Sequence, residues 1–83
     1  MPSEMIRRST VANEIADQVK VLLAIYTNSE QKYNETKDES VREFLKHEAF
    51  TNLHTAKALW KLARKIGASD AVQKEFEKAG IPI

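Results

Sequence analysis

The chain has 83 residues, 30% of them charged, with a formal net charge of +1 and no cysteine. This length allows one small domain, whose core supplies only about 3–5 kcal/mol of stability. The absence of cysteine excludes disulfides and thiolate metal sites. The nearly balanced charge is atypical of nucleic-acid-binding domains, which carry a basic excess, so it disfavours nucleic acid as a partner.

The first ten residues, MPSEMIRRST, lack the long apolar run of a signal peptide. No segment approaches the roughly 20 consecutive apolar residues that a membrane-spanning helix needs. We therefore expect a cytoplasmic protein that makes no contact with a membrane.

The first expected helix begins near Ser9 or Thr10 and covers about residues 10–36. Six of its residues, all apolar or aromatic except Ser29, follow one another at spacings of three and four, which is one face of an α-helix. The residues of this stripe are Ile15, Val19, Leu22, Tyr26, Ser29 and Tyr33.

The second expected helix covers about residues 40–66. Ser40 followed by Glu43 has the spacing of a capping box. In this motif the serine oxygen accepts a hydrogen bond from the backbone amide of Glu43, and the glutamate side chain reaches back to the backbone amide of Ser40. Gly67 follows the last helical residue, where a left-handed glycine ends many helices. The stripe of this helix comprises Val41, Leu45, Ala49, Asn52, Ala56, Leu59, Ala63 and Ile66.

A short third helix is expected at about residues 70–79. Asp70 and Gln73 have the spacing of a second capping box, and Gly80 and Pro82 end the helix. Val72 and Phe76 lie one turn apart, so they are expected to hold this helix against the other two.

The connection between the two long helices is short, which favours an antiparallel helical hairpin. The predicted fold class is therefore all-α, a hairpin plus a short third helix in a single domain. If the turn centres on Glu39, Tyr33 lies opposite Leu45, and Glu30 lies opposite Glu48.

The apolar arc of the two long helices is wider than the seam of one hairpin. An exposed apolar surface of that size usually marks an association surface. We therefore expect a homodimer in which two hairpins form a four-helix bundle, although an unidentified protein partner remains the alternative. The expected interface residues are Val21, Ile25, Phe44, Leu53, Trp60 and Leu62.

Polar residues interrupt the two stripes near their middle. We predict a buried polar layer with Glu48 hydrogen-bonded to a neighbouring tyrosine or amide, at some cost in stability. Its members are Tyr26, Tyr33, Glu48 and Asn52. This interpretation requires no metal. In the alternative, Glu30 and Glu48 bind iron or manganese, since carboxylate oxygens suit hard cations.

The stretch FTNLHTAKALWKLARKIG, preceded by a long helix with a tyrosine, resembles the second half of a ferritin-like (rubrerythrin-type) helical hairpin. The resemblance covers about residues 15–67. It implies a helical hairpin and, by position, Glu30 as the first-helix glutamate. The Glu-x-x-His motif of that superfamily is degenerate in this sequence. Thr51 stands in place of its glutamate if His54 is the histidine, and in place of its histidine if Glu48 is the glutamate.

The sequence contains no cysteine nucleophile, glycine-rich phosphate loop or nucleophile elbow. We therefore expect a non-enzymatic interaction module that self-associates through its apolar surface. The alternative is a degenerate ferritin-like protein that binds a metal through carboxylates.

Overall fold

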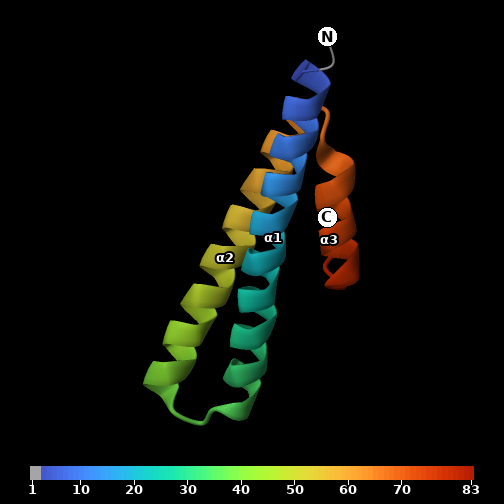
Figure 1. Cartoon of the computed structure of the whole chain (residues 1–83). Helices are drawn as coiled ribbons and strands as arrows, with labels where there is room; N and C mark the ends of the chain where they lie inside the picture. Colours follow the sequence, from blue (N-terminus) through green and yellow to red (C-terminus); the bar gives the residue numbers. More distant parts are fainter. Residues whose placement is uncertain (1–2) are drawn as a thin grey trace.

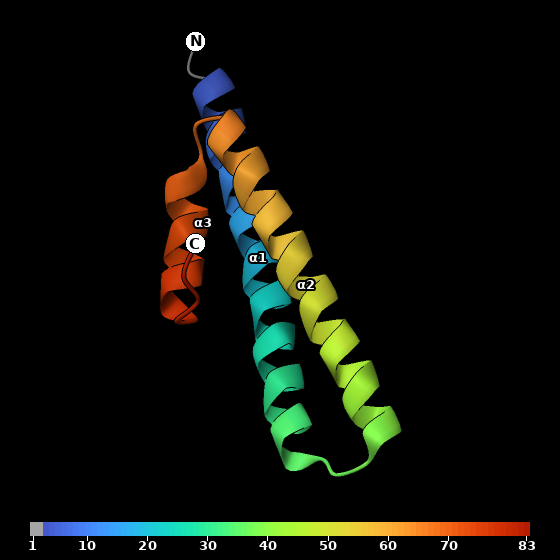
Figure 2. The same ribbon diagram turned by 180° about the vertical axis from the view of Figure 1, so that it is seen from behind.

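The structure is a computed structural model that describes residues 3–83, with side-chain environments for residues 9–83. Its three helices are α1 (Ser3–Glu35), α2 (Glu39–Lys65) and α3 (Ser69–Lys78), and the described residues form no strand. α1 and α2 form an antiparallel hairpin, and α3 runs back along one end of it (Figures 1 and 2). The prediction of an all-α hairpin with a short third helix is therefore confirmed.

The first helix begins at Ser3, not near Ser9 or Thr10 as predicted. Serine and threonine are common helix caps, but inside a helix each costs only a few tenths of a kcal/mol relative to better helix formers. The glutamate, methionine and arginines of residues 4–8 are good helix formers. The polar pair at residues 9–10 therefore does not end the helix.

The turn between α1 and α2 contains only residues 36–38, and Asp38 caps α2. One Asp38 carboxylate oxygen accepts hydrogen bonds from the amides of Ser40, at 2.9 Å, and Val41, at 3.2 Å. The prediction that Ser40 is the cap is wrong. Aspartate and serine cap about equally well, but aspartate also places a negative charge at the positive end of the helix dipole.

Gly67 ends α2 in the way the sequence predicted, with a positive φ of 70°. The amide of Ala68 donates to the carbonyl of Ala63 at 2.8 Å, and that of Gly67 donates to Arg64 at 3.1 Å. This pair of bonds is a Schellman motif, which satisfies carbonyls that a helix end leaves without partners. It reverses the chain so that α3 folds back along the hairpin.

α3 begins at Ser69 without a capping side chain, so the capping box predicted for Asp70 and Gln73 is wrong. The Gln73 amide instead donates to the carboxylate of Glu77 at 3.3 Å. Because the Schellman motif already directs the chain into α3, Asp70 lies within the first helical turn rather than before it. There its negative charge still favours the helix dipole.

The main hydrophobic core lies where all three helices meet. Its buried residues are Ile15, Val19, Leu23, Ala56, Ala63, Val72 and Phe76. Val72 and Phe76 are completely buried, so they attach α3 to the hairpin as predicted. The other buried residues of the hairpin, which are Ser29, Leu45 and Ala49, lie nearer the turn and outside this cluster.

The structure adds Leu23 to the core of α1. Leu23 is only 2% exposed, whereas Leu22, which the periodicity selected, is half-buried against the cluster. Leu23 lies on the side of α1 that faces α3, because it lines a hollow together with Glu75 of α3 and with Ala79, the residue that caps the end of that helix. The predicted stripe of α1 contains the residues that face α2, so it does not include Leu23.

α3 covers only one end of the hairpin. Its 10 residues span about 15 Å, whereas the 27 residues of α2 span about 40 Å. Beyond α3, the turn half of the hairpin extends as two helices alone (Figures 1 and 2), and the molecule measures 57 × 18 × 16 Å. A two-helix ribbon cannot bury apolar side chains on its flanks, so these remain exposed near the turn.

Candidate interaction surface

Four of the predicted interface residues lie on the side of the hairpin that faces away from α3. Val21 and Ile25 each stand two residues from Leu23, which places them roughly 160° from it around α1. On α2, Trp60 contacts the side of α3, since it lines a hollow with Gln73 and Glu77. By the same helical geometry, Phe44 and Leu62 point roughly 160° away from Trp60 around α2, and therefore away from α3. We call this set the open face, and its residues are Val21, Ile25, Phe44 and Leu62.

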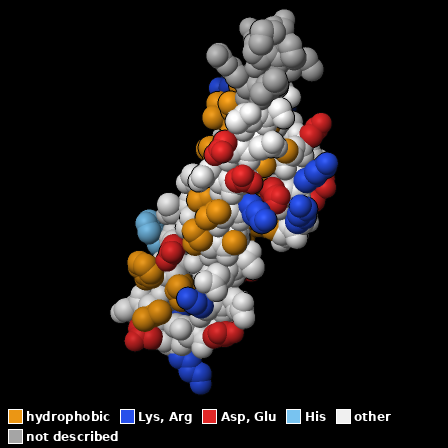
Figure 3. All heavy atoms as spheres, viewed as in Figure 1, with side chains coloured by type: hydrophobic (Ala, Val, Ile, Leu, Met, Phe, Trp, Pro, Cys, Tyr) orange, Lys and Arg blue, Asp and Glu red, His pale blue; other side chains and the backbone are white. Residues whose placement is uncertain are grey.

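The open face carries large apolar side chains in contact with solvent. Phe44 is 64% exposed, Val21 is 54% exposed and Leu62 is 48% exposed, while Ile25 is half-buried. The α2 residues between Phe44 and Leu62 on this side are Glu48, Thr51, Thr55 and Ala58, of which the last three are small. Figure 3 shows, for one side of the molecule, that hydrophobic side chains reach the surface along the middle and the turn half of the hairpin.

The other two predicted interface residues, Leu53 and Trp60, pack within the chain. Both are half-buried against the main core. The Arg64 guanidinium lies 4.8 Å from the centre of the Trp60 ring. The indole N–H of Trp60 is buried and makes no hydrogen bond with the described residues. α3 and the C-terminal residues thus cover part of the apolar arc that is predicted to form a dimer interface.

The predicted polar layer is half-buried and does not form one hydrogen-bonded unit. Tyr26, Tyr33, Glu48 and Asn52 all fall between buried and exposed. The Asn52 side-chain amide donates to the backbone carbonyl of Glu48 at 2.7 Å, not to its carboxylate. Such a bond to the preceding turn satisfies asparagine locally. Glu48 is half-buried, which is less than predicted. Tyr26 and Tyr33 interact with Glu30 and Arg42, respectively, and not with Glu48.

Both tyrosines lie in a groove that α3 leaves uncovered. The groove has a volume of about 230 Å³, and its lining residues are Tyr26, Glu30, Tyr33, Leu45, Lys46, Ala49 and Phe50. The Arg42 guanidinium lies 4.3 Å from the centre of the Tyr33 ring, within the range of a cation–π contact. Phe50, which is 53% exposed, is not among the predicted interface residues. A large aromatic residue outside the apolar stripe of α2, with Lys46, His47 and His54 one turn away, is the signal that could have indicated it.

Tyr26 interacts with Glu30, one turn further along α1. A hydrogen bond to the Glu30 carboxylate, burial, and the negative charge of Glu30 together raise the pKa of Tyr26. The protonated phenol is favoured because it donates to a carboxylate, and the phenolate would be repelled by it. Glu30 thus interacts with Tyr26 in the groove that the two tyrosines line, here called the tyrosine groove, and not with Glu48.

The metal alternative requires Glu30 and Glu48 to converge on one ion. Glu30 is exposed and lines the tyrosine groove, whereas Glu48 is half-buried and is not among its lining residues. His47 and His54 are both exposed. Among the described residues, no three histidine or acidic side chains come together in a way that could hold a metal ion.

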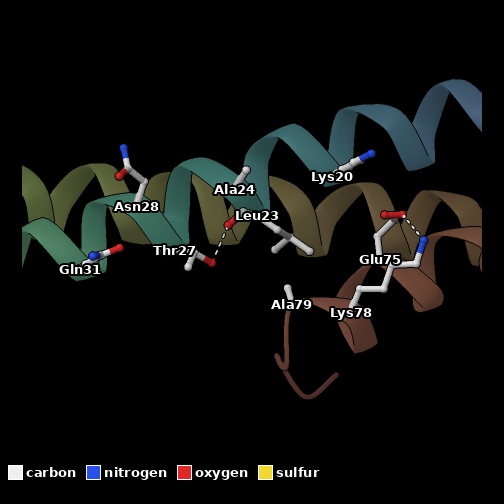
Figure 4. A pocket seen from close by; sticks show the side chains of 9 residues that line it. All are labelled: Lys20, Leu23, Ala24, Thr27, Asn28, Gln31, Glu75, Lys78 and Ala79. Atoms are coloured by element: carbon white, nitrogen blue, oxygen red, sulfur yellow. Dashed lines mark hydrogen bonds and ion pairs between the residues drawn. The ribbon is translucent and has the colours of Figure 1, made fainter.

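A second hollow, of about 420 Å³, lies between α1 and the end of α3 (Figure 4). Two interactions engage polar groups within it. The Thr27 hydroxyl donates to the Leu23 carbonyl at 2.9 Å, and Lys78 lies 3.7 Å from the Glu75 carboxylate. Both interactions are drawn in Figure 4, where the polar side chains do not converge on a common point. This hollow is an open notch where α3 ends.

No protein-family model, curated protein or solved structure matches the chain. Within the described residues, none of the three helices combines the length and apolar character needed to cross a bilayer.

Proposed function

We propose that the protein is a non-enzymatic helical interaction module that self-associates through the open face. The observation that carries this proposal is the exposure of large apolar side chains on the side of the hairpin away from α3. Phe44, Val21 and Leu62 are each about half exposed or more. A domain of 83 residues buries a modest fraction of its apolar surface, so large apolar side chains left in water reduce an already small stability.

A second copy of the chain can cover the apolar side chains that the hairpin leaves exposed on its open face. Two hairpins packed through their open faces form a four-helix bundle, in which the apolar side chains of each are covered by the other. The burial of apolar area stabilises such an assembly by about 25 cal/mol per Å² before the cost of association.

Sedimentation or light scattering across the micromolar range tests this proposal. We expect a mass near twice the chain mass of 9.4 kDa. Phe44→Lys should give a monomer with unchanged helix content, since Phe44 is an exposed residue whose replacement barely affects the folded chain. Ile83→Lys is the matched control, because Ile83 is also about half exposed but lies at the C-terminus. This variant should remain dimeric, and a wild-type protein that stays monomeric throughout would refute self-association.

A further inference from the structure

We propose that the open face binds a second copy of the chain in an antiparallel register, with Phe44 of each chain against the partner's Leu62. This inference rests on the proposed self-association and adds the direction and register of the two hairpins. Its basis is a two-fold pattern in both helices of the open face, together with the distribution of charge along α2.

The first part of the pattern is on α2. Phe44 and Leu62 are 18 residues apart, which is about five helical turns, so they project in the same direction about 27 Å apart. Leu53 lies midway between them in the sequence. A two-fold axis across the hairpin at the height of Leu53 therefore brings Phe44 of one chain onto the partner's Leu62, and the reverse. Between these two contacts, Thr51 lies level with the partner's Thr55, and Glu48 lies level with the partner's Ala58. Each of these facing pairs therefore contains at least one small side chain.

The second part is on α1, where one stripe contains Glu14, Val21, Ile25 and Lys32 at spacings of seven, four and seven. These spacings read the same in both directions about Leu23. A two-fold axis at that height places Val21 against the partner's Ile25. It also places Glu14 level with the partner's Lys32, and both of these charged residues are exposed. Apolar residues thus meet at the centre and opposite charges meet at each end.

The two centres lie within about 3 Å of the same height along the hairpin. α1 ends at Glu35 and α2 begins at Glu39 on either side of the short turn. Leu23 and Leu53 therefore lie about 18 and 21 Å from the turn along their helices. A single axis across the hairpin satisfies the pattern of both helices, which is the condition for a symmetric, self-complementary interface.

Charge favours the antiparallel direction over the parallel one. The last three turns of α2 contain Lys57, Lys61, Arg64 and Lys65 and no acidic residue, whereas its first turns contain both acidic and basic residues, including Glu39 and Glu43. If the two α2 helices packed in parallel, the two basic ends would lie together and repel each other. In the antiparallel arrangement, each basic end lies beside the acidic residues at the start of the partner's α2, and the two helix dipoles oppose each other.

Disulfide trapping tests this register without background, because the chain contains no cysteine. Phe44→Cys and Leu62→Cys chains are oxidised separately and as a mixture at concentrations where light scattering shows dimers. We expect a covalent dimer only in the mixture, with the mass of one chain of each kind. A disulfide in either variant alone would overturn the antiparallel register, because it joins identical positions.

A second pair keeps Phe44 and Leu62 intact, in case either is needed for assembly. Glu48 and Ala58 lie five residues on either side of Leu53 and border the open face of α2. The two-fold axis therefore places Glu48 of one chain level with the partner's Ala58, and Glu48→Cys and Ala58→Cys chains should crosslink only when mixed. If the protein is a dimer but neither mixture crosslinks, this register is wrong while self-association stands. If no dimer forms at any concentration, the proposed function itself fails.

The charged ends provide an independent test. Glu14→Lys and Lys32→Glu should each weaken dimerisation by roughly two- to tenfold, and the double variant Glu14→Lys/Lys32→Glu should restore it. Glu14 and Lys32 lie about 27 Å apart in one chain, so no contact within the monomer can produce this rescue. A double variant as weak as the product of its two single variants would contradict the pairing.

Discussion

The carboxylate of Asp38 accepts a hydrogen bond from the amide of Ser40 at 2.9 Å, in the same turn that joins the two long helices. Asp38 is thus the cap of α2, and Ser40 is a residue that is capped. We predict that Asp38→Ala lowers the free energy of unfolding by about 1 kcal/mol, since it leaves amides of the first turn without this acceptor.

Ser40→Ala is the matched control, because it removes a side-chain hydroxyl from the same turn without removing the acceptor. Its effect on the free energy of unfolding should fall within about 0.5 kcal/mol of zero. Chemical denaturation followed by circular dichroism measures both variants. Equal losses for the two would mean that Ser40 shares the capping role.

Gly67 adopts a φ of +70°, which residues with a Cβ rarely adopt. We predict that Gly67→Ala lowers the free energy of unfolding by about 1 kcal/mol, because alanine in the left-handed region is strained. Apart from Gly67 and its two chain neighbours, no described residue has an atom within 4 Å of the position that a Cβ would take, so the loss arises from the backbone and not from a clash. Gly67→Asn should lose less, because asparagine tolerates this conformation. A thermal melt in which both variants match the wild type would contradict this explanation.

The hydrogen bond between Tyr26 and Glu30 predicts a change at alkaline pH. Because the pKa of Tyr26 is raised in the folded state, the protonated phenol stabilises the fold. That contribution is complete below the ordinary tyrosine pKa of about 10 and is lost as pH rises through the raised pKa. The chain has two tyrosines, so Tyr33→Phe isolates Tyr26 for titration by ultraviolet absorbance. Adding Glu30→Gln should lower the pKa of Tyr26 toward its ordinary value, and an unchanged titration would show that Glu30 is not the cause.

Trp60 packs against the core beside α3, so its size should matter more than its N–H. We predict that Trp60→Ala costs about 3 kcal/mol in the free energy of unfolding, through lost burial and the cavity left behind. Trp60→Phe should cost much less, because it keeps an aromatic ring and the indole N–H makes no hydrogen bond with the described residues. Denaturant unfolding compares the two variants. Similar losses would indicate that the indole nitrogen has a role that its packing does not explain.

Local signals in the sequence predict the three helices and their order. The spacing of Ile15 and Val19, the glycines at positions 67 and 80, and the short connection near residue 38 each act over a few residues. Such signals remain readable without knowledge of the rest of the chain. Ser40 and Asp38 both stand at positions that can begin a helix, so propensity alone does not show which of them caps α2.

The location of α3 depends on contacts between residues far apart in the sequence. These contacts bury Leu23 more deeply than Leu22 and cover Leu53 and Trp60 within the chain. They leave Val21, Phe44 and Leu62 on the open side. Helical periodicity shows which residues share one face of a helix, but it does not show which neighbouring helix covers that face. That assignment follows from the packing of Val72 and Phe76 against the hairpin, because burial of these side chains determines which flank α3 occupies.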